Sequence, residues 1–136
     1  MSGITPHSGE CRCCFLFPGQ GAYLEEVFLE LANSWPQVRQ TFEEIDLALA
    51  VFGAPPVVPL LFNGSPPRLN HLVTNDPDTL QVALFGSAIA VYRVLESERI
   101  VPDVLVGHSL GEIAALVAGG AFTVGEGVLT DSRTAL

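Results

Sequence analysis

A serine lies between two glycines in the segment GHSLG, residues 107–111. An apolar run, residues 104–106, precedes it and an alanine-rich run follows, so the pattern G-x-S-x-G stands where a strand would turn into a helix. Such a turn exposes the Ser109 hydroxyl above the end of a sheet, beside the backbone N–H of Leu110. The pattern predicts Ser109 as a nucleophile; it also fits a turn in which the serine only caps the following helix.

A second chemical element is the glycine-rich segment FPGQG, residues 17–21, directly after the first apolar run. Backbone N–H groups freed in such a loop can face a developing oxyanion. An ordinary tight turn is the alternative interpretation. If both apolar runs are parallel strands, the two motif loops should meet at the carboxyl ends of those strands.

A serine hydroxyl needs a general base, and the chain has three histidines, His7, His71 and His108. Neighbouring residues leaving a strand point to opposite sides, so His108 is poorly aimed at the Ser109 hydroxyl and is expected to pack beside the site. His71 follows a proline-rich stretch and is interpreted as a surface residue. The base is therefore expected from elsewhere in the fold.

The elements that position these loops alternate between strand and helix. Residues 14–17 and 104–106 are predicted as buried strands, and the last predicted helix has Thr123 and Glu126 as a capping box and is still helical where the chain stops. A helix ending near residues 119–120 follows the serine. A mixed α/β class with parallel strands and flanking helices follows.

Three further helices are predicted before the serine. An amphipathic helix runs from Ala22, and a second has Ser34 as cap and Pro36 in its first turn. The third is capped by Asn75 or Asp76. Residues 54–75 are interpreted as an irregular crossing loop because they carry five prolines, three asparagines and a glycine. The apolar faces are assigned to Val38, Phe42, Ile45 and Leu49 of the second helix and to Leu80, Leu84, Val91 and Leu95 of the third.

Composition narrows the classes of function. The 136 residues are 49% hydrophobic and carry a net charge of −9, with six arginines and no lysine. This charge disfavours nucleic-acid binding. The start of the chain lacks the pattern of a secretory signal, and the apolar runs 82–95 and 48–62 are too short or too broken for a membrane span, so a cytoplasmic protein without a membrane partner is expected.

The cysteines Cys11, Cys13 and Cys14 stand together in the sequence. Their number and spacing do not suit a zinc site, and they are interpreted as reduced thiols at the start of a buried strand.

The segments "FPGQG", "TLQVALF" at 79–85 and "GHSLGE" at 107–112, in this order, resemble the acyltransferase family of malonyl-CoA:acyl carrier protein transacylases and of the acyltransferase domains of polyketide and fatty acid synthases. The resemblance implies a partial α/β-hydrolase-like acyltransferase core, truncated at the C-terminus. Residues 1–13 would be a polar leader, and residues 14–136 the N-terminal part of the domain.

The resemblance also implies roles. Ser109 would take an acyl group from a CoA thioester, the backbone N–H groups of Gln20 and Leu110 would form the oxyanion hole, and Gln81 matches a glutamine near the pocket. The acyl group would pass to the phosphopantetheine thiol of an acyl carrier protein, without a metal or other cofactor. An aliphatic residue after the serine accompanies malonyl transfer in this family, so Leu110 implies malonyl-CoA as substrate.

Three positions depart from the family. Its catalytic histidine lies far downstream, beyond the 27 residues that follow Ser109 here. Its carboxylate-binding arginine corresponds to Thr134, one position after Arg133, so Arg133 is either that arginine or an exposed helix residue. Tyr23 stands where the family often has a glutamine.

Two other classes of function stay open. One is a serine esterase or thioesterase of the α/β-hydrolase type, which shares the G-x-S-x-G turn. The other is a non-catalytic truncated module. We expect this chain by itself to be inactive because no histidine in it is placed as a base.

Overall fold

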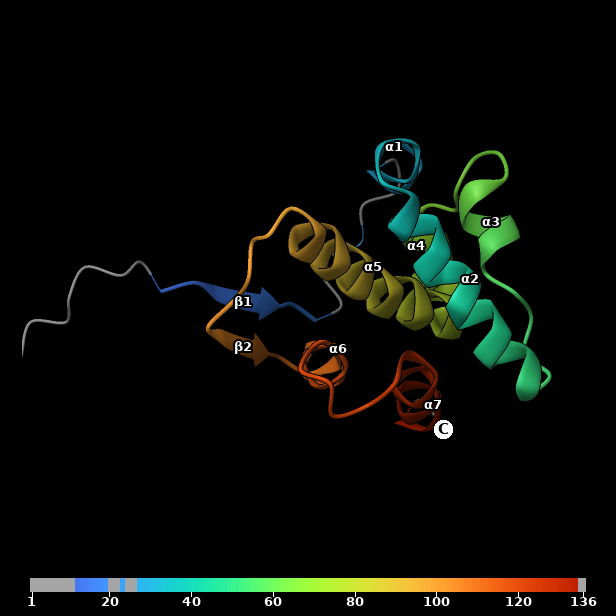
Figure 1. Cartoon of the computed structure of the whole chain (residues 1–136). Coiled ribbons are helices and arrows are strands. Elements are labelled where there is room, and N and C mark those ends of the chain that lie inside the picture. Colours follow the sequence, from blue (N-terminus) through green and yellow to red (C-terminus); the bar gives the residue numbers. More distant parts are fainter. Residues whose placement is uncertain (1–11, 20–22, 24–26, 135–136) are drawn as a thin grey trace, which may run out of the picture.

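The computed structural model describes residues 12–19, 23 and 27–134, with the side chains of residues 27–28 and 131–134 left out of the description. Its elements follow one another along the chain as the strand β1 (Cys14–Phe17), the helices α1 (Val27–Ser34), α2 (Pro36–Val51), α3 (Val58–Phe62), α4 (Leu69–Asn75) and α5 (Pro77–Ser97), the strand β2 (Val104–Gly107), and the helices α6 (Leu110–Ala118) and α7 (Val124–Thr134). Figure 1 shows the two strands side by side at one end of a mainly helical body.

The two strands form a parallel pair, in which Cys14 aligns with Val104 and Phe17 with Gly107. The amide of His108 extends the pairing past the strand ends by donating to the carbonyl of Phe17 at 3.1 Å. At the other end of the pair, the Asp103 carboxylate accepts from the amide of Cys13 at 2.7 Å. The α/β class with parallel strands and flanking helices is confirmed.

Helix α5 is the central element, because it packs against α2, α4, α6 and α7. Leu80 and Leu84 are buried as predicted, but Val91 is 44% exposed, so the predicted single apolar face is wrong at that position. With neighbours around it, α5 instead buries residues on several sides: Thr79, Leu80, Val82, Ala83, Leu84, Phe85, Gly86, Ile89, Ala90 and Val94. Its cap is Asp76, whose side chain accepts from the amide of Thr79 at 3.1 Å.

Helix α2 packs on α5 through the predicted face, and Val38, Phe42, Ile45 and Leu49 are all buried. The predicted cap Ser34 is wrong: α1 continues through Ser34, and Trp35 is the cap residue of α2, with no side-chain capping bond. Pro36 does occupy the first turn, where a missing N–H costs no hydrogen bond.

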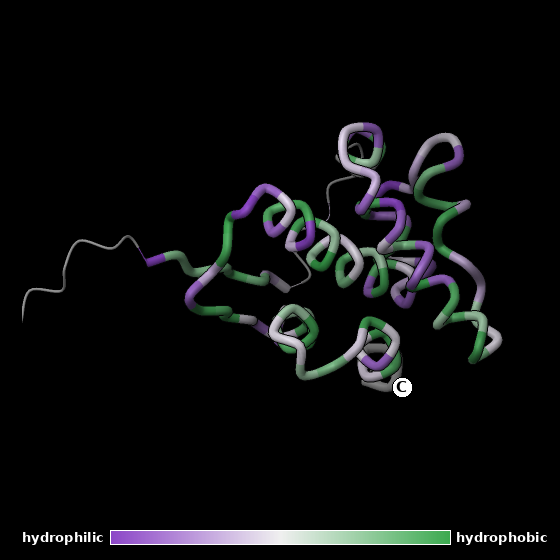
Figure 2. The backbone as a smooth tube through the Cα atoms, in the orientation of Figure 1, coloured by the Kyte–Doolittle hydropathy of each residue, from purple (hydrophilic) through white to green (hydrophobic). Residues whose placement is uncertain are grey.

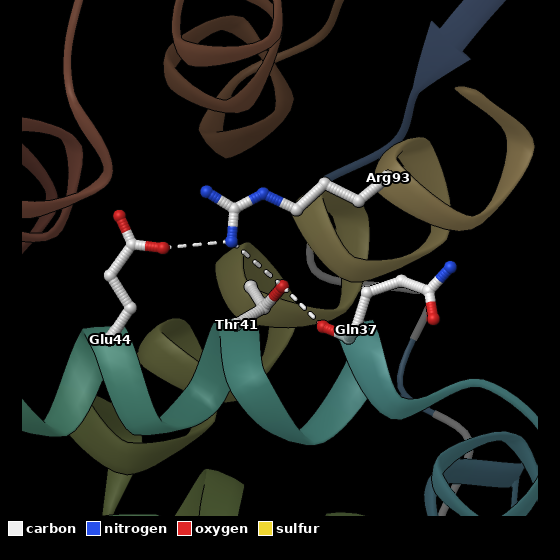
Figure 3. Close-up of polar contacts among 4 residues, drawn as sticks. All are labelled: Gln37, Thr41, Glu44 and Arg93. Atoms are coloured by element: carbon white, nitrogen blue, oxygen red, sulfur yellow. Dashed lines mark hydrogen bonds and ion pairs between the residues drawn. The ribbon is translucent and has the colours of Figure 1, made fainter. Parts of the chain in front are cut away.

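A cluster of hydrogen-bonded polar residues also joins α2 to α5 (Figure 3). Arg93 of α5 donates to the Glu44 carboxylate at 2.8 Å and to the hydroxyl of Thr41 at 3.1 Å. Thr41 is fully buried and in turn donates to the carbonyl of Gln37 at 2.7 Å. The arginine thus supplies a buried hydroxyl with its donor as well as pairing with an acid.

The predicted irregular loop over residues 54–75 is wrong in part, because it contains the two short helices α3 and α4. The Asp46 carboxylate accepts from the amides of Val57 and Val58, at 2.6 and 3.1 Å, and so caps α3 from outside the segment. Leu61 and Leu72 are buried in the core. A long-range cap and core burial outweigh the prolines, and sequence periodicity over such short helices carries little signal.

The predicted capping box of the last helix is confirmed. The carboxylate of Glu126 accepts from the amide of Thr123 at 2.8 Å, and the Thr123 hydroxyl accepts from the amide of Glu126 at 3.2 Å.

The strands are less buried than predicted. Leu16, Val104 and Val106 are 73, 53 and 46% exposed, and Cys14 is exposed, whereas Phe17 is buried. Cys14, Leu16, Val104 and Val106 lie on the same face of the strand pair. Within the described part of the chain, this face is left exposed. Figure 2 shows the hydrophobic residues that run along both strands.

By length and apolar composition, α5 is the one described helix that could cross a membrane. The sequence predicts no membrane span, because the apolar run 82–95 is too short for one. Helix α5 is longer than this run, since it also includes polar residues at both ends. Half of the apolar stretch of α5 is buried inside the fold. A central core helix has the same apolar composition, and the contacts of α5 with four other helices make this the interpretation that fits the structure.

Candidate functional site

The serine of the GHSLG motif lies between the end of β2 and the start of α6. Its backbone has φ 55° and ψ −122°, one of two positive-φ positions among the described non-glycine residues. A non-glycine residue in this region is strained and is held there by its surroundings. Although Ser109 is in the capping position of α6, its side chain makes no capping hydrogen bond. The Ser109 side chain is exposed and does not cap α6, so the capping interpretation does not describe this turn, and the role of Ser109 as a nucleophile stays a prediction.

The two glycines of the motif explain how this turn is held. A Cβ atom on Gly107 would lie 2.4 Å from the Cα of Glu112, and one on Gly111 would lie 1.9 Å from the carbonyl oxygen of Phe17. Both contacts are with backbone, which cannot move aside as a side chain can. Gly107 therefore lets the first turn of α6 follow closely on the end of β2, and Gly111 lets that turn pack on the end of β1.

The glycine-rich loop after β1 lies beside the serine. A Cβ atom on Gly19 would be 3.6 Å from His108 Nδ1 and 3.7 Å from the Cβ of Ser109, which is ordinary contact. The two motif loops therefore meet at the carboxyl ends of the parallel strands, as the sequence predicts. The sequence does not predict the contact between Gly111 and Phe17. Its one related signal is the glycine at the end of the G-x-S-x-G motif.

Of the two predicted donors of the oxyanion hole, Leu110 lies within the described residues and Gln20 does not. Leu110 is the first residue of α6 and is buried, and the first amides of a helix have no acceptor within the helix. Its N–H group therefore has no acceptor within α6, and its role as an oxyanion donor stays a prediction. Gln20 lies outside the described residues, so its role stays a prediction.

His108 is exposed, and its backbone is fixed by the amide that donates to Phe17. Its ring lies near Gly19, on the loop side of the turn. His71 is exposed on α4, where its ring contacts Asn75 at 3.3 Å, so it lies in a helix and not in a loop. His7 lies outside the described residues.

The remaining predicted residues lie on helices. Gln81 is half-buried near the start of α5. Arg133 is in the last turn of α7, and its side chain is outside the description. The roles of these two residues and of His108 in substrate binding stay predictions.

An apolar cavity of about 480 Å³ adjoins the site between β1 and α5. Its lining includes Gly19, Leu84, Val91 and Tyr92, but not Ser109. Cys14 also lines it, as a free thiol in agreement with the sequence, but this cysteine is exposed, so the prediction that it begins a buried strand is wrong. Cys11 lies outside the description. In the described residues, no three His, Cys, Asp or Glu side chains are grouped closely enough to hold a metal ion.

The chain is similar in sequence and in fold to known proteins. The chain is 34% identical over 119 residues to the malonyl CoA-acyl carrier protein transacylase of Bacillus subtilis, covering 88% of this chain and 35% of that protein. It is 32% identical over 133 residues to a non-reducing polyketide synthase of Pseudocercospora fijiensis, covering 98% of this chain and 7% of the synthase. The structure of the malonyl CoA-acyl carrier protein transacylase of Coxiella burnetii matches with a TM-score of 0.75 and 34% identity, over 90% of this chain and 36% of that one.

The chain thus spans about a third of the length of the transacylases it resembles. Residues 14–132 match the family described as "Acyl transferase domain". This match covers both motif loops, the two strands, the helices α1 to α6 and α7 as far as residue 132. The chain therefore belongs to the acyl transferase domain family.

Proposed function

We propose that this chain carries the nucleophile of an acyltransferase that moves an acyl group from a CoA thioester to the thiol of an acyl carrier protein, in fatty acid or polyketide synthesis. The observation that carries the proposal is the turn at Ser109. Ser109 has a strained backbone at the start of α6, and its side chain makes no capping hydrogen bond. It lies against the glycine-rich loop that follows β1. The names of the matched transacylases supply the substrate and the partner.

In the proposed reaction, the Ser109 oxygen attacks the thioester carbonyl and the bond from carbon to sulfur breaks, which releases CoA as a thiol and leaves an acyl-serine. The carrier thiol then attacks the acyl-serine and restores the hydroxyl. Leu110 N–H, together with Gln20 N–H, would donate to the oxyanion in both steps. The base that removes the serine proton would come from outside these 136 residues.

The proposed acyl group is malonyl. The aliphatic side chain of Leu110 follows the serine, and the names of the matched transacylases carry the same acyl group. Gln81, His108 and Arg133 would contact the substrate, and the Arg133 guanidinium suits the free carboxylate of a malonyl group. We further propose that the reaction requires no metal or other cofactor and takes place in the cytoplasm.

The test is to incubate the complete protein with malonyl-CoA and to look by mass spectrometry for a malonyl group on the Ser109 peptide. A phosphopantetheinylated carrier protein is then added, and the malonyl group is expected on its thiol. Ser109→Ala should abolish both products, whereas Ser97→Ala, at the far end of α5, should leave them unchanged. Free malonate in place of malonyl-carrier would instead identify a thioesterase.

A competition between malonyl-CoA and methylmalonyl-CoA tests the choice of acyl group. We expect the malonyl adduct to dominate. A clear preference for the branched unit would contradict the inference from Leu110, while leaving the role of Ser109 intact.

A further inference from the structure

The turn that carries Ser109 rests on the backbone carbonyl of Phe17, the last residue of β1. The amide of His108, directly before the serine, donates to this oxygen at 3.1 Å. Two residues after the serine, Gly111 lies so close that a Cβ atom there would be 1.9 Å from the same oxygen. The turn is therefore held against Phe17 on both sides of Ser109, so a shift of Phe17 would move the serine hydroxyl.

The side chain of Phe17 is held in turn by a tyrosine of α5. The Phe17 side chain is 5% exposed, and its ring centroid lies 6.3 Å from that of Tyr92, with 42° between the ring planes. The same tyrosine meets the ring of Phe15 edge-on, at 6.1 Å and 81°. Both are favourable distances for aromatic pairs. One ring on α5 therefore contacts both aromatic side chains of β1.

A cavity adjoins this aromatic contact. The apolar cavity of about 480 Å³ between β1 and α5 is lined by Phe15, Phe17 and Tyr92, among other residues. Side chains in a protein interior keep their positions through close packing, and a neighbouring void gives them room to shift once a contact is removed. Loss of the Tyr92 ring would enlarge the cavity on the side where Phe17 is now supported.

The Tyr92 ring, and not its hydroxyl, makes this contact. Burial raises the pKa of Tyr92, and the nearby Glu96 carboxylate raises it further, so the hydroxyl stays neutral at neutral pH. It therefore adds no charge beside Phe17. Phenylalanine at this position would keep the ring contact with β1 intact.

From this arrangement we propose that Tyr92 is a positioning residue for the acyl transfer reaction: its ring holds Phe17 in place, and the Phe17 carbonyl holds the turn that presents Ser109 to the thioester. The inference rests on the proposed function. Tyr92 acts through Phe17 and does not contact the reacting atoms. A displacement of about 1 Å in a reacting group can reduce a rate about a hundredfold, so a smaller shift of the turn should slow acylation more than it weakens binding.

The test compares Tyr92→Leu with Tyr92→Phe in the complete protein. Tyr92→Leu removes the ring, and the rate of Ser109 acylation by malonyl-CoA should fall about tenfold, while KM changes less than twofold. Hydrogen exchange of the peptide with residues 106–112 should become faster, because the acceptor of the His108 amide is no longer fixed. Tyr92→Phe should match wild type in both measurements. Leu72→Ala, which truncates a buried side chain of α4, should lower stability without slowing acylation.

A second variant tests whether Tyr92 acts through Phe17. Phe17→Leu removes the other ring of the contact and should slow acylation by a similar factor. Because both substitutions break one contact, the double variant should be no slower than the slower single variant. Losses that multiply in the double variant would overturn the proposal.

A slow Tyr92→Phe variant would also overturn the proposal, as would Tyr92→Leu at the wild-type rate or a loss in Leu72→Ala equal to that in Tyr92→Leu. If Tyr92→Leu does not fold, Phe17→Leu and Tyr92→Phe decide, and wild-type acylation in the first or slow acylation in the second contradicts the inference. If wild-type Ser109 is not acylated at all, the proposed function fails, and the exchange comparison still decides whether Tyr92 holds the turn.

Discussion

At the scale of single residues, the candidate site depends on glycines that permit backbone contact. Gly111 is the clearest case, because a Cβ there would lie 1.9 Å from the Phe17 carbonyl oxygen and 2.6 Å from its carbon. We expect Gly111→Ala to separate α6 from β1 and to lower the free energy of unfolding by about 2 kcal/mol or more. Urea unfolding of the complete protein measures this change.

Gly19→Ala is the matched comparison, because the added methyl group would meet the His108 carbonyl oxygen at 3.5 Å and Ser109 at 3.7 Å. We expect stability within about 1 kcal/mol of wild type. The methyl group would nevertheless narrow the space beside the serine and slow its acylation. Equal stability losses in the two alanine variants would contradict the backbone contact at Gly111.

The capping box of α7 gives a prediction on pH. Hydrogen bonds from the amide and then from the hydroxyl of Thr123 hold the pKa of Glu126 below its ordinary value. A lowered pKa means that the ionised carboxylate stabilises the fold above the pKa of the unfolded chain, and that this contribution is lost as the pH falls through the folded pKa. Thr123→Val removes only the hydroxyl and should raise the pKa of Glu126 part of the way back. Carbon-detected NMR titration of the Glu126 carboxyl measures it, and an unchanged pKa would show that the amide alone sets it.

At the scale of elements, the crossing of α2 and α5 sets the core. A Cβ on Gly86 of α5 would lie 2.5 Å from the ring of Phe42 and 2.8 Å from Ile45, and both side chains are fully buried. We expect Gly86→Ala to push the helices apart and to cost about 1–3 kcal/mol in thermal or urea unfolding.

Gly125→Ala in α7 is the control for that substitution. Its Cβ would meet only the Cβ of Ala48, at 3.6 Å, so the new methyl group fits. Alanine also favours a helix over glycine, and we expect a change between zero and a gain of about 1 kcal/mol. A loss as large as that of Gly86→Ala would show that helix glycines matter here for another reason than contact.

At the scale of the whole molecule, the apolar face formed by Cys14, Leu16, Val104 and Val106 is open in the described structure. A two-stranded sheet with an exposed apolar face is marginal in water and tends to associate. We expect the isolated 136-residue chain to self-associate in sedimentation experiments, and Leu16→Ser to reduce this. Val73→Ser, which removes a 57% exposed side chain from α4, should not reduce it.

The same isolated chain should not sustain acyl transfer. His71 is exposed on α4, and we expect the His108 ring to be poorly aimed at the Ser109 hydroxyl because neighbouring residues leaving a strand point to opposite sides. Removing the base from a catalytic unit of this kind costs several orders of magnitude in rate. Steady transfer from malonyl-CoA to a carrier protein, at the rate of a complete domain, would show that one of these histidines does act as the base.

The sequence by itself determined the elements whose signals are local. The G-x-S-x-G motif identified the turn at Ser109, periodicity identified the buried face of α2, and the pair Thr123 and Glu126 identified the start of α7. Each depends on residues a few positions apart, so the chain carries the information within one or two turns.

Only the tertiary structure decided the features that join distant residues. Helices α3 and α4 form inside a proline-rich stretch because Asp46 caps α3 and the core buries Leu61 and Leu72. Val91 is exposed, although it shares a helix face with buried leucines, because the neighbours of α5 determine which sides are covered. The bond between Tyr23 and Pro67 spans 44 positions. Burial and long-range hydrogen bonds depend on which elements meet in space, and no local pattern in the sequence records that.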